Sequence, residues 1–114
     1  MALTTTNLTA DGTTLVGTLK QGQRGIPSNV GIHAHGAFGS GTITFQYSFD
    51  GGTTKATIKE GPGTSATDIS YTASGGFTWI SPVSTGGAPI LLYAVLSGST
   101  AADIDVYVVD QNNG

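Results

Sequence analysis

The 114-residue sequence contains no cysteine and few charged residues. Without cysteine the chain has no disulfide framework and no thiolate metal site, so its stability must come from packing or from contacts between chains. Charged side chains make up 10% of the residues, against about 25% in typical soluble domains, so hydroxyl and amide groups must supply most of the polar surface.

Basic residues and long apolar runs are also scarce. The net charge is −3, and the four basic residues are scattered along the chain: Lys20, Arg24, Lys55 and Lys59. Since nucleic-acid binding needs clustered positive charge, we expect no nucleic-acid partner. The longest apolar run, 89 to 96, is far shorter than the roughly 20 residues of a membrane-spanning helix, so we expect no membrane partner.

The composition is instead rich in glycine and threonine, which favours short strands joined by turns. The clearest strand is 42 to 49, in which Ile43, Phe45, Tyr47 and Phe49 alternate with polar residues. Such period-two alternation predicts a strand with one buried and one exposed face. The D-G-G sequence at 50 to 52 then supplies a tight turn.

Weaker strand patterns continue on both sides of this stretch. We predict that 30 to 37, 42 to 49 and 54 to 59 form an antiparallel meander, and that 104 to 108 forms the last strand. Further short strands are predicted at 67 to 72 and 77 to 80. The run I-L-L-Y-A-V-L at 90 to 96 is apolar on both parities, which predicts a strand covered on both sides, with a buried helix as the alternative.

The whole pattern predicts one all-β domain spanning 1 to 114, with seven to nine short strands. An antiparallel β-sandwich of immunoglobulin-like or jelly-roll-like type fits best, and a small barrel remains open. The segment 1 to 29 has the thinnest apolar pattern, with a strand expected at 13 to 20. It is predicted to be either an edge element or an extended arm that orders against a partner.

Two pairs of titratable residues have the spacing of a shared strand face. His33 and His35 would lie about 7 Å apart on one face of a strand, close enough to share a metal ion. No third ligand is evident nearby, so an exposed polar pair is the favoured interpretation, and we expect neither a metal nor a cofactor. Asp103 and Asp105 form a similar pair on the solvent face of the last strand. Carboxylates on one solvated face lack the cleft that a glycosidase needs.

No nucleophile motif of the G-x-S-x-G type and no phosphate-binding loop is present, so we expect no enzymatic activity. Phe77 and Trp79, with Tyr71 and Tyr93, would form a carbohydrate-binding platform if their ring faces were exposed. Packing in the core is the more common role of such aromatic residues.

Two stretches resemble a known group of proteins. The runs G-T-I-T-F-Q-Y-S-F-D-G-G-T-T at 41 to 54 and I-L-L-Y-A-V-L-S-G-S-T-A-A-D-I-D-V-Y-V-V at 90 to 109 are similar to small accessory virion proteins of tailed bacteriophages. The resemblance implies a non-enzymatic structural protein, most often a capsid decoration or cement protein, or else a head, neck or tail accessory protein.

The same resemblance implies the partners. They would be the major capsid protein or other virion proteins, and the chain would form a homo-oligomer, with a trimer favoured over a dimer. Since residues 1 to 6 have neither the basic nor the apolar region of a secretion signal, we expect assembly in a host cytoplasm and residence in the virion. The residues expected to contact the partner lie in the N-terminal segment and in the loops: Leu3, Leu8, Leu15, Ile26 and Val83.

Overall fold

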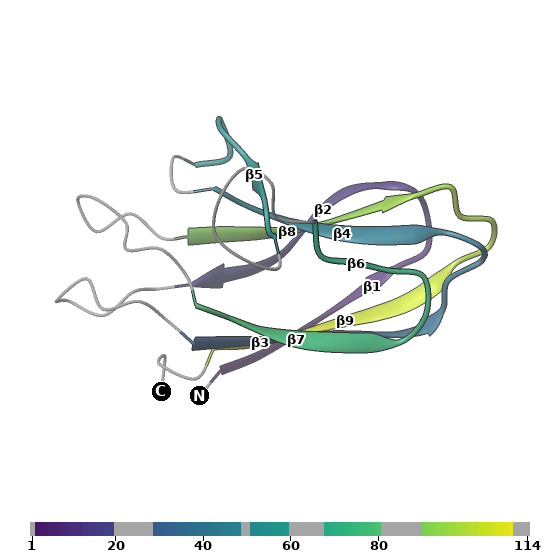
Figure 1. Cartoon of the computed structure of the whole chain (residues 1–114), viewed down its shortest axis with the longest axis horizontal. Helices are drawn as coiled ribbons and strands as arrows, with labels where there is room; N and C mark the ends of the chain where they lie inside the picture. The colour runs from purple at the N-terminus through teal and green to yellow at the C-terminus, as the bar shows by residue number, and fades with distance from the viewer. Residues whose placement is uncertain (1, 20–28, 49–50, 60–67, 81–89, 111–114) are drawn as a thin grey trace, which may run out of the picture.

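The computed structural model describes residues 2–19, 29–48, 51–59, 68–80 and 90–110. Within these ranges the chain forms nine strands and no helix, and hence no helix that could cross a bilayer. The strands make two antiparallel sheets packed face to face (Figure 1). The predicted β-sandwich is therefore confirmed.

The two sheets divide the strands almost equally. Sheet A has the order β1, β9, β3, β7, with bounds Ala2–Leu8, Asp103–Asp110, Asn29–Ala37 and Gly75–Ile80. Sheet B has the order β2, β8, β4, β5, with bounds Gly12–Leu19, Ile90–Ser97, Thr42–Ser48 and Ala56–Thr57; β6 (Ser70–Tyr71) also pairs with β4.

Most connections carry the chain from one sheet to the other. β1 is followed by β2 in the opposite sheet, and the same is true of β3 and β4, of β6 and β7, and of β8 and β9. Two antiparallel layers, here of four and five strands, that exchange consecutive strands in this order form a jelly roll. Of the sandwich types expected from the sequence, the structure thus has the jelly-roll arrangement.

The predicted meander is wrong in one part. β4 pairs with β5, but β3 lies in sheet A between β9 and β7, and makes no pair with β4. The turn between them is tight: the Gly41 amide donates to the Phe38 carbonyl (2.8 Å). Gly39 has a φ of +58°, and a Cβ there would overlap the Thr100 carbonyl. Alternation in the sequence identifies which face of a strand is buried, but it does not identify the neighbouring strand. Two consecutive strands with buried faces can pair within one sheet or pack against each other from opposite sheets.

Strand β4 has the predicted inward face. Ile43 and Phe45 are fully buried, and Tyr47 is half-buried against the core. The alternation shifts at the end of the strand, where Ser48 is fully buried and its hydroxyl accepts a hydrogen bond from the Gly52 amide (2.9 Å). Phe49 and Asp50 lie outside the described residues.

Strand β8 lies at the centre of sheet B, between β2 and β4. Its inward residues, Ile90, Leu92, Ala94 and Leu96, are buried, whereas the outward residues of the same strand are half-buried. The prediction of a strand is confirmed and the helical alternative is wrong. Coverage on the outer side is only partial.

The N-terminal segment consists of edge strands in its described part. β1 pairs with β9 at the edge of sheet A, and β2 pairs with β8 at the edge of sheet B. Leu8, Val16 and Leu19 belong to the core. The arm interpretation is therefore wrong for 2–19, because each of these strands pairs with a neighbouring strand along one side and contributes residues to the core.

The strands between β4 and β8 differ in length from those predicted. β5 and β6 contain two residues each, whereas β7 begins at Gly75 and includes the two glycines expected to form a break. Gly76 pairs with His33 and Gly75 with Ala34. Pairing along β3 thus overrides the turn preference of this glycine pair.

Candidate functional site

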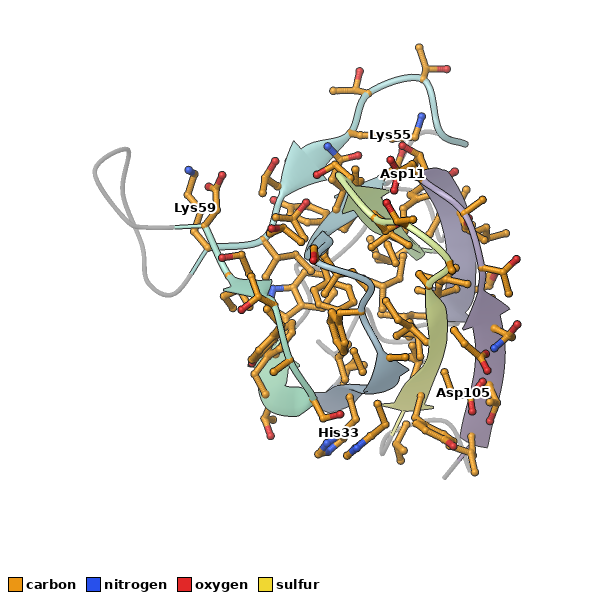
Figure 2. The ribbon with its side chains drawn as sticks, turned by 90° about the vertical axis from the view of Figure 1, so that its right-hand side faces the viewer. Asp11, His33, Lys55, Lys59 and Asp105 are labelled. Carbon is orange, nitrogen blue, oxygen red and sulfur yellow. The ribbon has the colours of Figure 1, made fainter. Side chains whose placement is uncertain are left out.

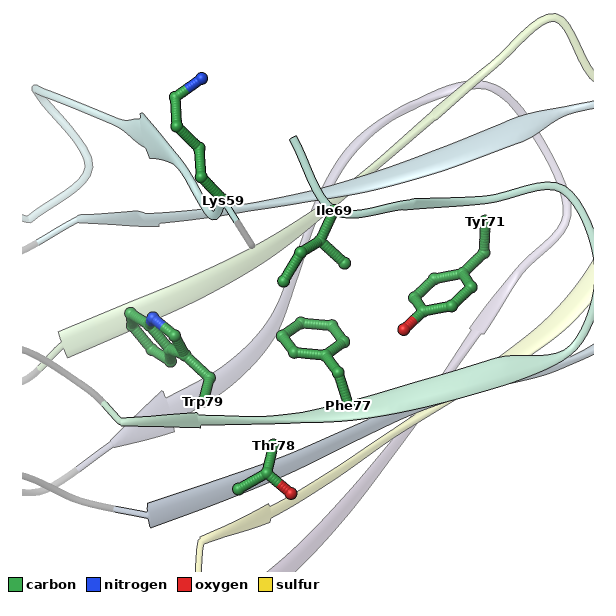
Figure 3. Close-up of a pocket in the computed structure, with 6 residues that line it drawn as sticks. All are labelled: Lys59, Ile69, Tyr71, Phe77, Thr78 and Trp79. Carbon is green, nitrogen blue, oxygen red and sulfur yellow. The ribbon is translucent and has the colours of Figure 1, made fainter. Parts of the chain in front are cut away.

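A pocket of about 320 Å³ opens on one side of the sandwich, between the edge of sheet A and the edge of sheet B. Figure 3 shows the lining side chains of β7 facing those of the segments around β6. The residues that line the pocket are Lys59, Ile69, Tyr71, Phe77, Thr78 and Trp79.

Aromatic rings form the wall of this pocket that lies nearest the core. Phe77 and Trp79 are two residues apart on β7, so they share the inward face. Phe77 packs against Phe45 and Tyr71, with ring centroids 5.4 and 6.2 Å apart. Trp79 packs against Tyr47 at 5.2 Å. Each of these β7 rings is half-buried, so it both closes the side of the core and borders the pocket.

An ion pair lies at the rim of the pocket. The Lys59 ammonium donates to Asp68 Oδ1 (2.6 Å), and the same two residues form an isolated backbone bridge. Both side chains are more than one-third exposed, so the pair contributes little to stability. The ion pair and the backbone bridge connect the segment that ends at Lys59 with the segment that begins at Asp68.

The outer face of sheet B is unusual in its lack of charge. Strands β2, β8 and β4 contain no Asp, Glu, Lys, Arg or His. Leu15 of β2 is 47% exposed on this face, and its register partner on β8 is the half-buried Tyr93. Leu91 and Val95, which lie two residues to either side of Tyr93 on β8, are also half-buried. We call Leu15, Leu91, Tyr93 and Val95 the sheet B face. The Lys55 ammonium, from the segment before β5, lies over the Tyr93 ring, 5.0 Å from its centroid, so one cation from outside these three strands reaches this face.

The outer face of sheet A carries the polar pairs. His33 and His35 are exposed, with ring centroids 5.8 Å apart and ring planes 15° apart, and the His35 ring meets Tyr107 edge-on at 5.9 Å. Figure 2 shows His33 and Asp105 on the opposite side of the molecule from Lys55. The predicted shared face of the two histidines is confirmed.

This histidine pair supplies two imidazole groups that could bind a metal ion. Among the residues that the structure describes, no group of three or more His, Cys, Asp and Glu side chains could hold a metal ion. Asp105 is the register partner of His35 on β9. That no metal or cofactor is bound stays a prediction.

The two carboxylates of β9 share one amide donor. The Asn7 side-chain nitrogen donates to Asp103 Oδ1 (2.8 Å) and to Asp105 Oδ1 (2.9 Å). Asp103 is exposed and Asp105 is half-exposed, on the solvent face of β9, as predicted. The pair lies on β9, which is not adjacent to β7 in sheet A, and so lies away from the aromatic pocket.

Asp11 has a structural role that the sequence did not indicate. Its carboxylate accepts hydrogen bonds from the Ser99 hydroxyl (2.5 Å), the Ser99 amide (3.0 Å) and the Gly98 amide (3.1 Å). The hydrogen bonds from Ser99 and, to a lesser extent, from Gly98 hold the pKa of this carboxyl below its ordinary value, against a small opposing effect of desolvation. A D-G pair such as the one at 11 and 12 indicates by itself only a turn.

The residues predicted to contact a partner separate into three groups. Leu8 is 4% exposed and belongs to the core, so its predicted role in partner contact is wrong. Leu3 and Leu15 are exposed, but they lie at the edges of different sheets. Ile26 and Val83 lie outside the described residues.

Comparisons of the chain with protein-family models, with curated proteins and with solved structures found no match.

Proposed function

We propose that this protein is a non-enzymatic structural protein that binds an assembly of other protein subunits, specifically as a decoration or cement protein on the outer surface of a bacteriophage capsid. The observation that supports it most is the uncharged outer surface of sheet B, where three adjacent strands carry no charged side chain and Leu15 is 47% exposed.

An uncharged face of this kind is suited to burial against another protein. The centres of protein interfaces are depleted of charged residues, because removing a charge from water costs more than its pairing returns. The sheet B face presents a leucine and a tyrosine beside threonines, whose hydroxyls cost less to remove from water than charged groups do. Sheet A, with its histidines and aspartates, would then face the solvent.

The architecture and the sequence resemblance agree with this proposal. Jelly rolls occur in viral capsid proteins and in lectins, although a fold does not by itself determine a function. The runs at 41 to 54 and 90 to 109 that resemble accessory virion proteins include β4 and β8, which are two of the three uncharged strands. A head-tail or tail accessory protein would use the same face.

The proposal is tested by co-sedimentation with expanded shells assembled from a bacteriophage major capsid protein. We expect the purified protein to bind the shells and to raise their melting temperature. Leu15→Glu places a charge in the centre of the contact and should weaken binding at least tenfold, which corresponds to about 1.4 kcal/mol. Leu3→Glu, on an exposed leucine of sheet A, is the matched control and should bind as the wild type does.

Two results would contradict this function. One is a wild-type protein that does not sediment with shells at any concentration tested. The other is equal weakening by Leu3→Glu and Leu15→Glu, which would show that the sheet B face is not the contact. Size measurement of the free protein by ultracentrifugation tests the expected homo-oligomer, for which we propose a trimer.

A further inference from the structure

We infer that the pocket between β7 and β6 binds one sugar ring of a glycan. This activity goes beyond the proposed structural role and uses a different part of the molecule. The pocket is bordered by side chains of the two sheet edges, whereas the sheet B face lies on the outer surface of β2 and β8. The two contacts can therefore coexist.

The apolar wall of the pocket suits the face of a sugar ring. Tyr71, Phe77 and Trp79 follow one another along the opening, and Ile69 fills the side opposite β7 (Figure 3). Aromatic rings attract the C–H groups that a pyranose presents on its faces, as they attract other apolar surfaces. The packing of Trp79 on Tyr47 and of Phe77 on Phe45 fixes these rings before any ligand arrives, which lowers the entropic cost of binding.

The pocket also offers a hydroxyl to the polar edge of a sugar. Lys59 lines the pocket, but its ammonium is paired with Asp68 and points away from the aromatic rings (Figure 3), so this ion pair lies outside the contact with the ring. The Tyr71 hydroxyl points into the space beside Phe77 (Figure 3). A sugar hydroxyl can exchange a hydrogen bond with this tyrosine hydroxyl, whereas a wholly apolar ligand cannot.

The volume of the pocket limits the size of the bound group. Binding sites for small molecules span roughly 300 to 1,000 Å³, and this one, at about 320 Å³, lies at the lower end. It accommodates one ring, so further residues of a glycan would extend into solvent. Affinity for a single sugar should be weak, because few atoms make contact.

The inference is tested by nuclear magnetic resonance titration of the full chain with methyl glycosides of glucose, galactose, mannose and N-acetylglucosamine. For at least one of them we expect saturable shifts at the Trp79 indole and the Phe77 ring, with none at His33 or His35. Indole is titrated in parallel as an apolar ring without hydroxyls. Saturable shifts with indole and with no glycoside would overturn the inference.

Two conservative variants separate binding from folding. Tyr71→Phe keeps the ring that packs on Phe77 and removes only the hydroxyl, so it should weaken glycoside binding at least threefold. Tyr93→Phe makes the same change on the sheet B face and should leave glycoside binding unchanged. Equal affinity in wild type and Tyr71→Phe would overturn the assigned site. Shell binding by Tyr71→Phe should equal that of the wild type, so the two proposals fail independently.

Discussion

Asp11 links two parts of the sequence that no local pattern connects. It lies just before β2, and its carboxylate holds the turn between β8 and β9, 87 and 88 residues further along the chain. One exposed side chain thereby connects the start of β2, the first strand of sheet B, with the turn that follows β8, the last strand of sheet B. Three donors meet this carboxylate, and each of them favours its ionised form.

Asp11 should therefore make stability depend on pH in the acid range. Its pKa is lowered in the folded state from 3.8, so the folded protein releases this proton more readily than the unfolded chain does. The stabilisation is fully present above the unfolded value and is lost as the pH falls through the lower folded value. We expect Asp11→Asn, which cannot titrate, to lose less stability than the wild type does as the pH falls below 3.8.

Thermal unfolding of both proteins between neutral and strongly acid pH measures this difference. Ser99→Ala removes the donor with the largest effect on the pKa and should give an intermediate slope. Identical slopes for wild type and Asp11→Asn would show that these hydrogen bonds do not persist in solution.

Among the elements, β1 is the one whose role the structure changes most. The sequence allowed either an edge strand or an arm, and its residues pair with β9 from Ala2 to Leu8. The two leucines of the strand have different roles: Leu8 is 4% exposed and Leu3 is 64% exposed. A docked arm would contribute little to the stability of the free domain, whereas an edge strand with a core residue contributes directly.

The pair Leu8→Ala and Leu3→Ala distinguishes these two roles. Truncating Leu8 removes buried methyl groups and leaves a cavity, so we expect a loss of about 2 to 5 kcal/mol in the free energy of unfolding. Leu3→Ala removes the same atoms from an exposed site and should change it by less than about 0.5 kcal/mol. Urea denaturation of the free protein measures both, and a small loss in both variants would support the arm.

Alternation in the sequence was sufficient to predict most strands but not their neighbours. β4 and β9 each bury one parity, so their positions followed from residues such as Phe45 and Val106. Which strand pairs with which depends on the turns: Gly39 adopts a left-handed conformation in the turn that leads from sheet A to sheet B, and no periodicity encodes that turn. The positions of Gly75 and Gly76 in β7 likewise depend on pairing with β3.

For the aromatic pocket, too, the sequence predicted some of the lining residues but not how they come together. The spacing of Phe77 and Trp79 indicated a shared face, and the structure places both beside the pocket. Lys59, Ile69 and Asp68 come from segments without alternation, and they reach the rim through one isolated bridge and a short backbone hydrogen bond from the Ile69 amide to the Ile58 carbonyl (3.0 Å). Only the folded chain brings these groups together.

For the whole molecule, the long-range pairing of the chain ends sets the cost of folding. Ala2 is the register partner of Asp110, so the first and last strands lie side by side in opposite directions (Figure 1). Pairing β1 with β9 closes a loop of about a hundred residues. The chain must lose the conformational entropy of that loop before the contacts between β1 and β9 form. Since the ends are adjacent, joining them by a short linker removes that cost without disturbing either sheet.

We therefore expect a circular permutant, with residues 114 and 1 joined and new ends between Thr53 and Thr54, to form the same jelly roll. Thr53 and Thr54 are exposed, and the pairing that becomes distant, β4 with β5, involves only two residue pairs. Shortening the closed loop from about a hundred to about ten residues lowers its entropic cost by about 2 kcal/mol. Stopped-flow refolding should accelerate by up to about 30-fold if β1 and β9 are paired in the transition state. An unchanged rate would place this pairing after the transition state, and a permutant that does not fold would contradict the adjacency of the chain ends.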